Sequence, residues 1–335
     1  MSNSALTQPR LRLPGTVSIG LERSDGAILA AAFATTLAVS WLSQTHPAAM
    51  PAWAPWEFSW TQFLAIALAL AWYMRGLVLL PAAERPHPMR TVAFLAGLAT
   101  IYTVVLTHFE YMTQHMFFLN RIQHLALHHL GPFLIALAWP GAALLRGMPA
   151  PLRRVVESPG LARVMCVVQQ PVIAGTLFAG LIYLWLIPAV HFRAMIDPEL
   201  YDVMNWSMAI DGLLFWSLVM DPRPSPPARI SFAQRMIVTV LVMFPQILIG
   251  ATVSFSTTSL YPYYDLCGRL FPSIGALYDQ HIGGVILWIP SAMMSSVAFM
   301  LTLNNVRRHE DRMAEVETDP RAREMAAMAS RWTGR

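Results

Sequence analysis

Residues 60–80 read WTQFLAIALALAWYMRGLVLL, and this stretch is the clearest indication of how the chain folds. Its only charged residue is Arg75. An apolar stretch of about 20 residues is long enough to cross a bilayer as a helix. The 335-residue chain is 56% hydrophobic and 13% charged, whereas soluble domains carry about 25% charged residues. The sequence therefore predicts a helical membrane protein.

Further apolar stretches follow the same pattern along the chain. The predicted spans are residues 25–43, 60–80, 91–109, 118–145, 166–190, 203–220, 233–254 and 281–303. Proline removes a backbone donor and bends a helix, so Pro132 and Pro140 predict a kink in the fourth span, as Pro245 does in the seventh. We expect an all-α, polytopic membrane helix bundle over residues 25–303. It has about eight transmembrane helices, seven being the alternative count.

The arginines predict the orientation of this bundle. All 23 basic residues are arginines. Of these, 19 lie in residues 1–24, 81–90, 146–163, 221–235 and the tail after 303. Positive residues concentrate on the cytoplasmic side of a membrane, so we expect two cytoplasmic tails, 1–24 and 304–335. The first apolar run begins near Ala27 without a cleavage-site pattern, which predicts a retained first span.

Several function classes have no support in the sequence. No Rossmann, Walker or zinc-finger spacing is present. The net charge of +4 does not indicate a nucleic-acid partner, because in a membrane protein the placement of arginines matters more than their number. Cys166 and Cys267 form no CxxC motif. The partner that composition does predict is the lipid bilayer.

The histidines lie mostly on one side of the predicted bundle. With this topology, eight of the ten histidines fall at the outer face or in the outer half of the bilayer. They are His46, His108, His115, His124, His128, His129, His191 and His281. Histidine is the commonest metal ligand and carries protons near neutral pH. Ionisable groups within a membrane are costly and tend to be functional.

The fourth span carries the strongest candidates for a metal site. His124 and His128 are four residues apart, which places them on one face of an α-helix. A helix uses this spacing to offer two imidazoles to one metal ion. His129 is expected to point about 100° away. His191 ends the fifth span and His281 opens the eighth, so both are candidates for further ligands.

A second group of candidate ligands lies where the third and fourth spans meet. His108 and His115 lie there beside Met112 and Met116. Soft thioether ligands together with imidazoles suit Cu(I). Two plainer interpretations stay open, because polar tips favour the headgroup region and methionine is a common packing residue.

Two further features lie toward the predicted outer side. Asp211 is about 12 Å below the outer end of the sixth span. A buried carboxylate needs a partner or a raised pKa, so a structural hydrogen bond and a proton or ion role both stay open. The long loop 255–280 contains Tyr261, Tyr263 and Tyr264. These tyrosines suit a membrane-interface belt, or the loop covers an outward-facing pocket.

Several motifs resemble one known family. They are Gln123-His124 with Pro132-Phe133-Leu134 and Pro140, Leu184-Trp185 with Pro188, Leu214-Phe215-Trp216, Leu260-Tyr261-Pro262, and Asp279-Gln280-His281-Ile282-Gly283-Gly284 with Trp288-Ile289-Pro290. Their order over about residues 90–300 is similar to that of the multi-spanning CtaG-type cytochrome c oxidase assembly proteins. The stretch D-Q-x-x-G-G-x-x-x-W is the most specific part. The chain differs from the family pattern at three histidines, where it has Asn120, Leu186 and Asn205; nearby replacements are His128, His129 and His191.

The resemblance implies a role in assembling a haem–copper cytochrome c oxidase in the bacterial plasma (inner) membrane. It implies a multi-pass protein that is not an enzyme and that binds copper at the outer face and hands it over. The implied partners are immature oxidase subunits and a periplasmic copper chaperone. We expect His124 and His128 to hold the ion between the third, fourth, fifth and eighth spans, with His191 or His281. Gly283 and Gly284 would let the eighth span pack closely.

Three rival functions stay open on the sequence. A metal transporter would need a polar path to the cytoplasm, and the inner halves of the spans offer little beyond Arg75. A haem- or quinone-binding electron carrier would need groups such as His128 and His191 at one depth. A metal-free assembly scaffold is the third.

Overall fold

The computed structural model describes residues 23–56 and 58–318, which form helices and connecting loops without a strand. The α-helices are α1 (Arg23–Thr45), α2 (Trp60–Leu79), α3 (Pro88–Leu106), α4 (His108–Thr113), α5 (Phe117–Leu125), α6 (Gly131–Ala138), α7 (Gly141–Gly147), α8 (Ala150–Val156), α9 (Pro159–Val168), α10 (Pro171–Leu186), α11 (Pro188–Ile196), α12 (Pro198–Val219), α13 (Phe232–Ser254), α14 (Tyr263–Leu266) and α15 (Ala276–Thr318). Short helices of other types are the 3-10 helices η1 (Pro47–Ala49) and η2 (Ala82–Glu84) and the π-helix η3 (Ala126–Leu130). The predicted all-α class is confirmed.

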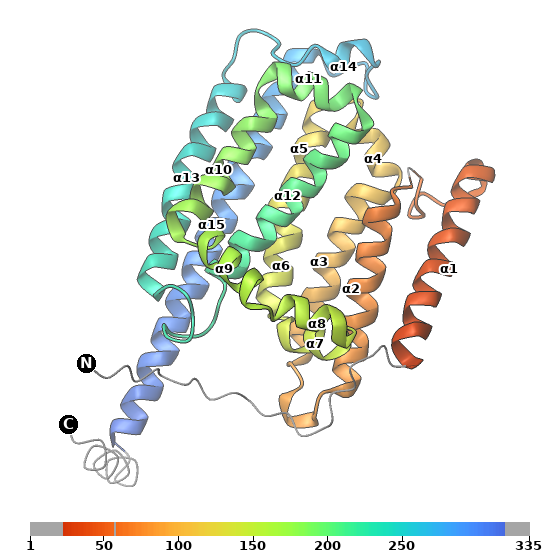
Figure 1. The fold of residues 1–335 in the computed structure, drawn as a ribbon. Helices are drawn as coiled ribbons and strands as arrows, with labels where there is room; N and C mark the ends of the chain where they lie inside the picture. The colour runs from red at the N-terminus through yellow and green to blue at the C-terminus, as the bar shows by residue number, and fades with distance from the viewer. Residues whose placement is uncertain (1–22, 57, 319–335) are drawn as a thin grey trace.

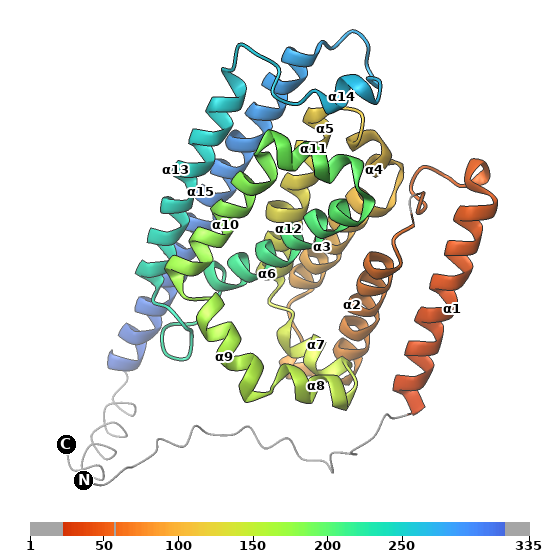
Figure 2. The same ribbon diagram turned by 45° about the horizontal axis from the view of Figure 1, so that its top comes forward.

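The long helices run side by side as a bundle (Figures 1 and 2). Helices α13 and α15 pack along each other, α10 packs on α13, and α1 lies at the opposite edge against α2. Helices α5, α6 and α12 occupy the middle. We call the end with α11 and α14 the α14 end, and the end with α7 and α8 the α8 end (Figure 1). The predicted orientation would make the α14 end the outer one.

Length and composition identify the helices that can cross a membrane. Within the described residues, α1, α2, α3, α13 and α15 qualify individually. Two bent helix pairs raise the number to seven if each pair is one span. Helix α12 does not qualify, because Asp202, Asn205 and Asp211 lower its hydropathy. The chain is therefore a multi-pass membrane protein with five to seven candidate spans, and eight spans and the orientation of the tails stay predictions.

The predicted fourth span, residues 118–145, is broken. Its two parts meet at an angle of 80°. The bend follows Trp139, whose φ of 52° is left-handed, and Pro140, which cannot continue the helix. The kink predicted at Pro140 is thus present. It is a break between two separate helices, α6 and α7, and not a bend within one helix.

The other proline of this span, Pro132, follows a π-helix, η3. Because Pro132 has no N–H, the carbonyl of His128 lacks its usual partner four residues on. The Trp216 indole of α12 donates to that carbonyl at 3.1 Å. A Cβ at Gly212 would lie 2.5 Å from the same oxygen, so α12 approaches η3 closely only because residue 212 is glycine.

The predicted fifth span also begins later than expected. Residues 166–190 were expected to form one helix, but α9 and α10 meet at an angle of 70°. The break lies at Gln169 and Gln170, and Pro171 starts the new helix. The Gln170 side chain caps it by accepting from the Ile173 N–H at 2.9 Å.

Arg75 has a partner that the sequence did not predict. It forms an ion pair with the buried Asp25 of α1, and it donates to the Gly147 carbonyl at 3.1 Å. A Cβ at Gly147 would lie 1.8 Å from the Trp72 carbonyl oxygen, so α2 and α7 pack at nearly backbone distance. Arg75 thereby connects α1, α2 and α7 near the α8 end.

Candidate functional site

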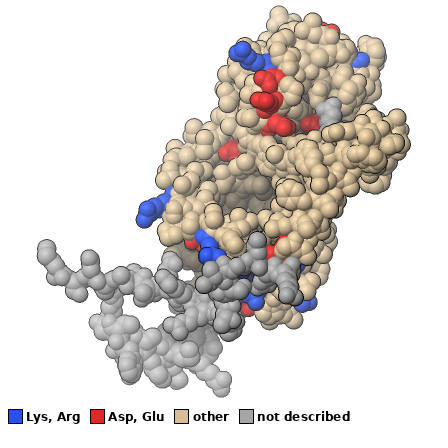
Figure 3. All heavy atoms as spheres, turned by 45° about the vertical axis from the view of Figure 1, so that its right-hand side comes forward, with Lys and Arg blue, Asp and Glu red and all other residues tan. Residues whose placement is uncertain are grey.

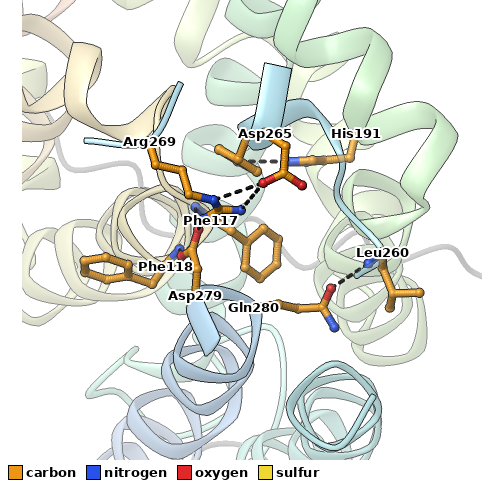
Figure 4. Close-up of polar contacts among 9 residues, drawn as sticks. Phe117, Phe118, His191, Leu260, Asp265, Arg269, Asp279 and Gln280 are labelled. Atoms are coloured by element: carbon orange, nitrogen blue, oxygen red, sulfur yellow. Dashed lines mark hydrogen bonds and ion pairs between the residues drawn. The ribbon is translucent and has the colours of Figure 1, made fainter. Parts of the chain in front are cut away.

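A group of buried polar residues fixes the long loop to the α14 end of the bundle. Asp279 of α15 accepts from the backbone N–H groups of Phe117 (3.0 Å) and Phe118 (2.8 Å), which caps the N-terminus of α5 (Figure 4). Arg269 of the loop pairs with the same carboxylate at 2.8 Å and with the half-exposed Asp265 at 2.8 Å. Asp279 is completely buried. One carboxylate therefore holds together α5, α15 and the loop.

Gln280 continues this attachment. Its Oε1 accepts from the Leu260 N–H at 2.7 Å, and its amide nitrogen donates to the carbonyls of Thr258 (3.2 Å) and Val253 (3.3 Å) (Figure 4). The Gln280 side chain thus satisfies backbone groups at the end of α13 and at the start of the loop. We call Arg269, Asp279 and Gln280 the loop clamp.

His191 is placed beneath the same loop. Its Nδ1 lies 3.2 Å from the Trp185 carbonyl, which can only accept, so Nδ1 carries the proton. Its Nε2 therefore accepts from the Tyr264 hydroxyl at 3.0 Å. Burial raises the pKa of Tyr264, and burial followed by the nearby Arg121 lowers the pKa of His191. A neutral His191 with both nitrogens occupied is not available to a metal ion in this arrangement.

Tyr261 closes the loop onto the bundle. Its ring stacks on Phe117 with centroids 4.2 Å apart, and its hydroxyl donates to the Leu186 carbonyl at 3.0 Å. Burial raises the pKa of Tyr261 to about 12, so the hydroxyl keeps its proton at neutral pH. The tyrosines are therefore part of the loop's packing, and Tyr261 is buried rather than lying in an interface belt.

Small residues let α15 approach its neighbours at this end. A Cβ at Gly283 would lie 2.4 Å from the Phe117 ring, and one at Gly284 would lie 2.4 Å from the Ser254 hydroxyl oxygen. One turn further on, Trp288 packs against α13, where a Cβ at Gly250 would lie 2.5 Å from its ring. The D-Q-x-x-G-G-x-x-x-W stretch thus combines the clamp with close helix packing.

The π-helix changes the predicted pairing of the histidines. His128 turns toward α12, where its Nε2 lies 3.0 Å from Oδ2 of Asp211. His129 Nε2 lies 2.9 Å from Oε1 of Gln246 on α13. His124 and His129, not His124 and His128, border the same small cavity. A π-helix has a longer repeat than an α-helix, which brings His129 to the cavity that His124 borders, while His128 also lies near His124.

His124 is buried and has no hydrogen-bond partner at either ring nitrogen. Its cavity of about 10 Å³ is also bordered by Arg121, Met208 and Ser291. Arg121 is buried without a carboxylate: it donates to Asn120 and lies over the Phe117 ring, and its Nε has no partner. The charge of Arg121 opposes a cation beside His124.

The remaining candidate ligands lie elsewhere at the α14 end. His108 packs against the rings of Trp56 (4.4 Å) and Tyr111 (5.4 Å). His115 Nδ1 lies 2.9 Å from the Tyr111 carbonyl, and His281 Nε2 lies 2.8 Å from the Ser256 carbonyl. In the part of the chain that the structure describes, no three His, Cys, Asp or Glu side chains come together to hold a metal ion. Within the described residues, the candidate histidines therefore form no cluster of three or more.

A polar pocket opens at the α14 end instead. Its volume is about 460 Å³, and Glu110, Gln114, Met195 and Asp202 border it together with the loop before α2. Acidic side chains gather on this part of the surface (Figure 3). Such a surface attracts cations and basic segments.

Sequence reasoning missed several polar residues of the interior. Arg121 was not among the candidate site residues, although it is one of the few arginines outside the predicted cytoplasmic segments. Gln123 donates to the Val104 carbonyl at 2.8 Å and accepts from the Tyr201 hydroxyl at 2.8 Å, which ties α5 to α3 and α12. The sequence does contain one indication of their importance, because Arg121 and Gln123 are polar residues inside an apolar stretch.

Comparison with known proteins gives one result. The model of the family described as cytochrome c oxidase caa3 assembly factor matches residues 71–309, which is more than half of the chain. No curated protein and no solved structure matches. The matched region runs from α2 to α15 and includes the loop clamp and the histidines of the π-helix. The chain belongs to the cytochrome c oxidase caa3 assembly factor family.

Proposed function

We propose that this protein, in the bacterial plasma membrane, binds an immature subunit of a haem–copper cytochrome c oxidase and supports its assembly. The family match over residues 71–309 carries this proposal. The family is described by assembly and by no reaction, so we infer a role as an assembly factor and not as an enzyme.

The α14 end suits the binding of such a subunit. The loop clamp fixes the long loop against α5 and α13, so this surface is ordered before a partner arrives. The pocket that contains Glu110 and Asp202 opens at the same end of the bundle. We infer that a basic segment of the immature subunit docks at this acidic pocket, because opposite charges favour and orient association.

A second candidate function is transfer of copper at the same end, as cargo. One observation favours it: within the π-helix, His128 and His129 each direct Nε2 to an acceptor and leave a buried Nδ1 without a partner. Metal-ligating histidines are oriented in this way. The charge of Arg121 and the small cavity beside His124 count against it, so we rank it below subunit binding.

One experiment separates the two functions. The gene is deleted, and the oxidase is examined for subunit amount, haem and copper. Loss of the subunit itself supports binding of the immature protein, whereas a stable subunit with haem but no copper supports copper transfer. Normal oxidase in the deletion strain contradicts both.

Variants then locate the activity. We expect Glu110→Gln with Asp202→Asn to lower oxidase assembly, and Asp265→Asn, an exposed change at the same end, to preserve it. Copper content is measured on purified, reduced wild-type protein beside His124→Ala/His128→Ala. If the wild-type protein holds about one copper ion per chain and the double variant holds none, copper transfer becomes the better supported function. If neither protein holds copper, the copper-transfer function is excluded.

A further inference from the structure

A second cavity opens on the side of the bundle, between α2, α3 and α12. Its volume is about 290 Å³. A hollow is visible on this face of the molecule, below the acidic group (Figure 3). We call it the lateral cleft. Its walls are aliphatic and aromatic, with two exceptions, Gln62 of α2 and Asn205 of α12.

The two amides lie at the end of the cleft nearest the α14 end. Gln62 donates to Oδ1 of Asp202 at 3.1 Å, and the Trp206 indole donates to the Thr61 hydroxyl at 3.1 Å. These bonds join the start of α2 to α12 on either side of Asn205. Gln62 and Asn205 therefore belong to one polar spot at the top of an apolar cleft.

The side-chain oxygens of Gln62 and Asn205 receive no hydrogen bond. Gln62 and Asn205 are more than nine-tenths buried, and neither Oε1 of Gln62 nor Oδ1 of Asn205 accepts a hydrogen bond. The Tyr201 hydroxyl lies near Asn205, but its proton goes to Gln123. A buried acceptor without a donor is unfavourable, because it has lost its hydrogen bonds to water. The spot therefore offers two acceptors to a molecule that donates hydrogen bonds.

The shape and charge of the cleft narrow the choice of that molecule. Along α12 the lining runs from Asn205 to Leu213, which is about 12 Å and close to the depth of one leaflet. No charged side chain lines it. Asp202 beside Gln62 opposes a phosphate group at the top. An ester carbonyl of a phospholipid can only accept, so it would leave both amide oxygens unsatisfied.

We propose that the lateral cleft binds an isoprenoid quinol, with its two head hydroxyls donating one to Gln62 and one to Asn205 and the chain lying between α2, α3 and α12. A quinol carries two hydroxyl groups, one for each amide oxygen. The oxidised quinone has only acceptors and could use the Asn205 nitrogen alone, so it binds more weakly. This site adjoins the acidic pocket at Asp202, which accepts from Gln62, but the proposal does not depend on the proposed function.

The test measures binding of decylubiquinol and decylubiquinone to the purified full-length protein in nanodiscs. We expect the quinol to bind on the order of tenfold more tightly than the quinone. Asn205→Leu should weaken quinol binding by a similar factor and remove the preference for the reduced form. Equal binding of both forms by the wild type would overturn the proposal.

A filled cleft provides the control for shape. Ala209 lines the cleft on α12, whereas its neighbour Ile210 is exposed on the same helix. Ala209→Trp should abolish quinol binding and Ile210→Trp should preserve it, with equal helix content in both. Mass spectrometry of lipids carried by the wild-type protein is the second measurement. Quinone enriched over its share in the membrane supports the site, while phospholipid alone, or equal enrichment with Ala209→Trp, overturns it.

Discussion

The loop clamp and the histidines of the π-helix both bury polar groups, but they differ in how those groups are satisfied. In the clamp, Asp279 accepts three hydrogen bonds and Gln280 makes three. In α5, just before the π-helix, His124 makes none, and in the π-helix His128 and His129 each leave one nitrogen without a partner.

This difference separates structural polar residues from candidate functional ones. A satisfied buried group stabilises one arrangement of the chain, whereas an unsatisfied one costs free energy unless something else binds there. We infer that the clamp holds the fold and that the unsatisfied groups are available for ligands. The two regions should therefore respond differently to substitution.

The largest effect is expected at the centre of the clamp. Asp279→Ala removes the cap of α5 and leaves Arg269, which is mostly buried, without its inner partner. Breaking a buried ion pair from one side costs about 3–5 kcal/mol. We expect a large fall in the unfolding temperature of the purified protein in detergent. Asp265→Ala removes the half-exposed partner of the same arginine and should cost below about 1 kcal/mol; equal losses would show that the clamp is not the stronger contact.

A smaller loss is expected where α15 packs on α13. A Cβ at Gly284 would lie 2.6 Å from the Ser254 backbone nitrogen, which cannot move without shifting the helix. Overpacking of this kind costs about 1–3 kcal/mol. Gly284→Ala should lower the unfolding temperature, and Gly275→Ala, whose Cβ would meet nothing within 4 Å, should not. Similar curves for the two variants would contradict the close approach.

Much of the helical architecture was predictable from apolar length. The stretches 60–80 and 233–254 correspond closely to α2 and α13. Proline predicted the break at residue 140, because its backbone restriction is local. The break before Pro171 was missed, since the apolar stretch continues across it while Gln170 supplies a helix cap.

The candidate site was less predictable, because its contacts join residues far apart in the chain. Spacing placed His124 and His128 on one face of an ideal α-helix, but the π-helix turned His128 toward Asp211, 83 positions away. The position of Asp279 beside Phe117 likewise depends on how α15 packs against α5. Motifs therefore pointed to the right residues, while their partners required the structure.

A moderate, pH-dependent effect is expected at His191. Burial and then Arg121 lower its pKa below the ordinary value of 6.5. The unfolded chain therefore takes up this proton first as the pH falls, so the free energy of unfolding decreases below about pH 6.5 and is unchanged above it. The slope from one group is at most about 1.4 kcal/mol per pH unit.

The matched variant isolates this proton from other histidines. His191→Gln retains a donor for Trp185 and an acceptor for Tyr264 but cannot be protonated. We expect the fall in unfolding temperature between pH 8 and pH 5.5 to be smaller in this variant than in the wild type. An identical fall in both would place the acid sensitivity elsewhere.

The smallest effect on stability is expected at His124. Neither ring nitrogen has a partner, so His124→Leu removes no hydrogen bond and leaves no group newly unsatisfied. His129→Leu, in contrast, deprives the Gln246 oxygen of its donor and should cost about 1–3 kcal/mol. If His124→Leu instead destabilises the protein as much as His129→Leu, His124 has a partner such as water or an ion. If cuprous ion then raises the unfolding temperature of the wild type but not that of His124→Leu, the partner is copper. His124 would in that case bind the copper that the protein transfers.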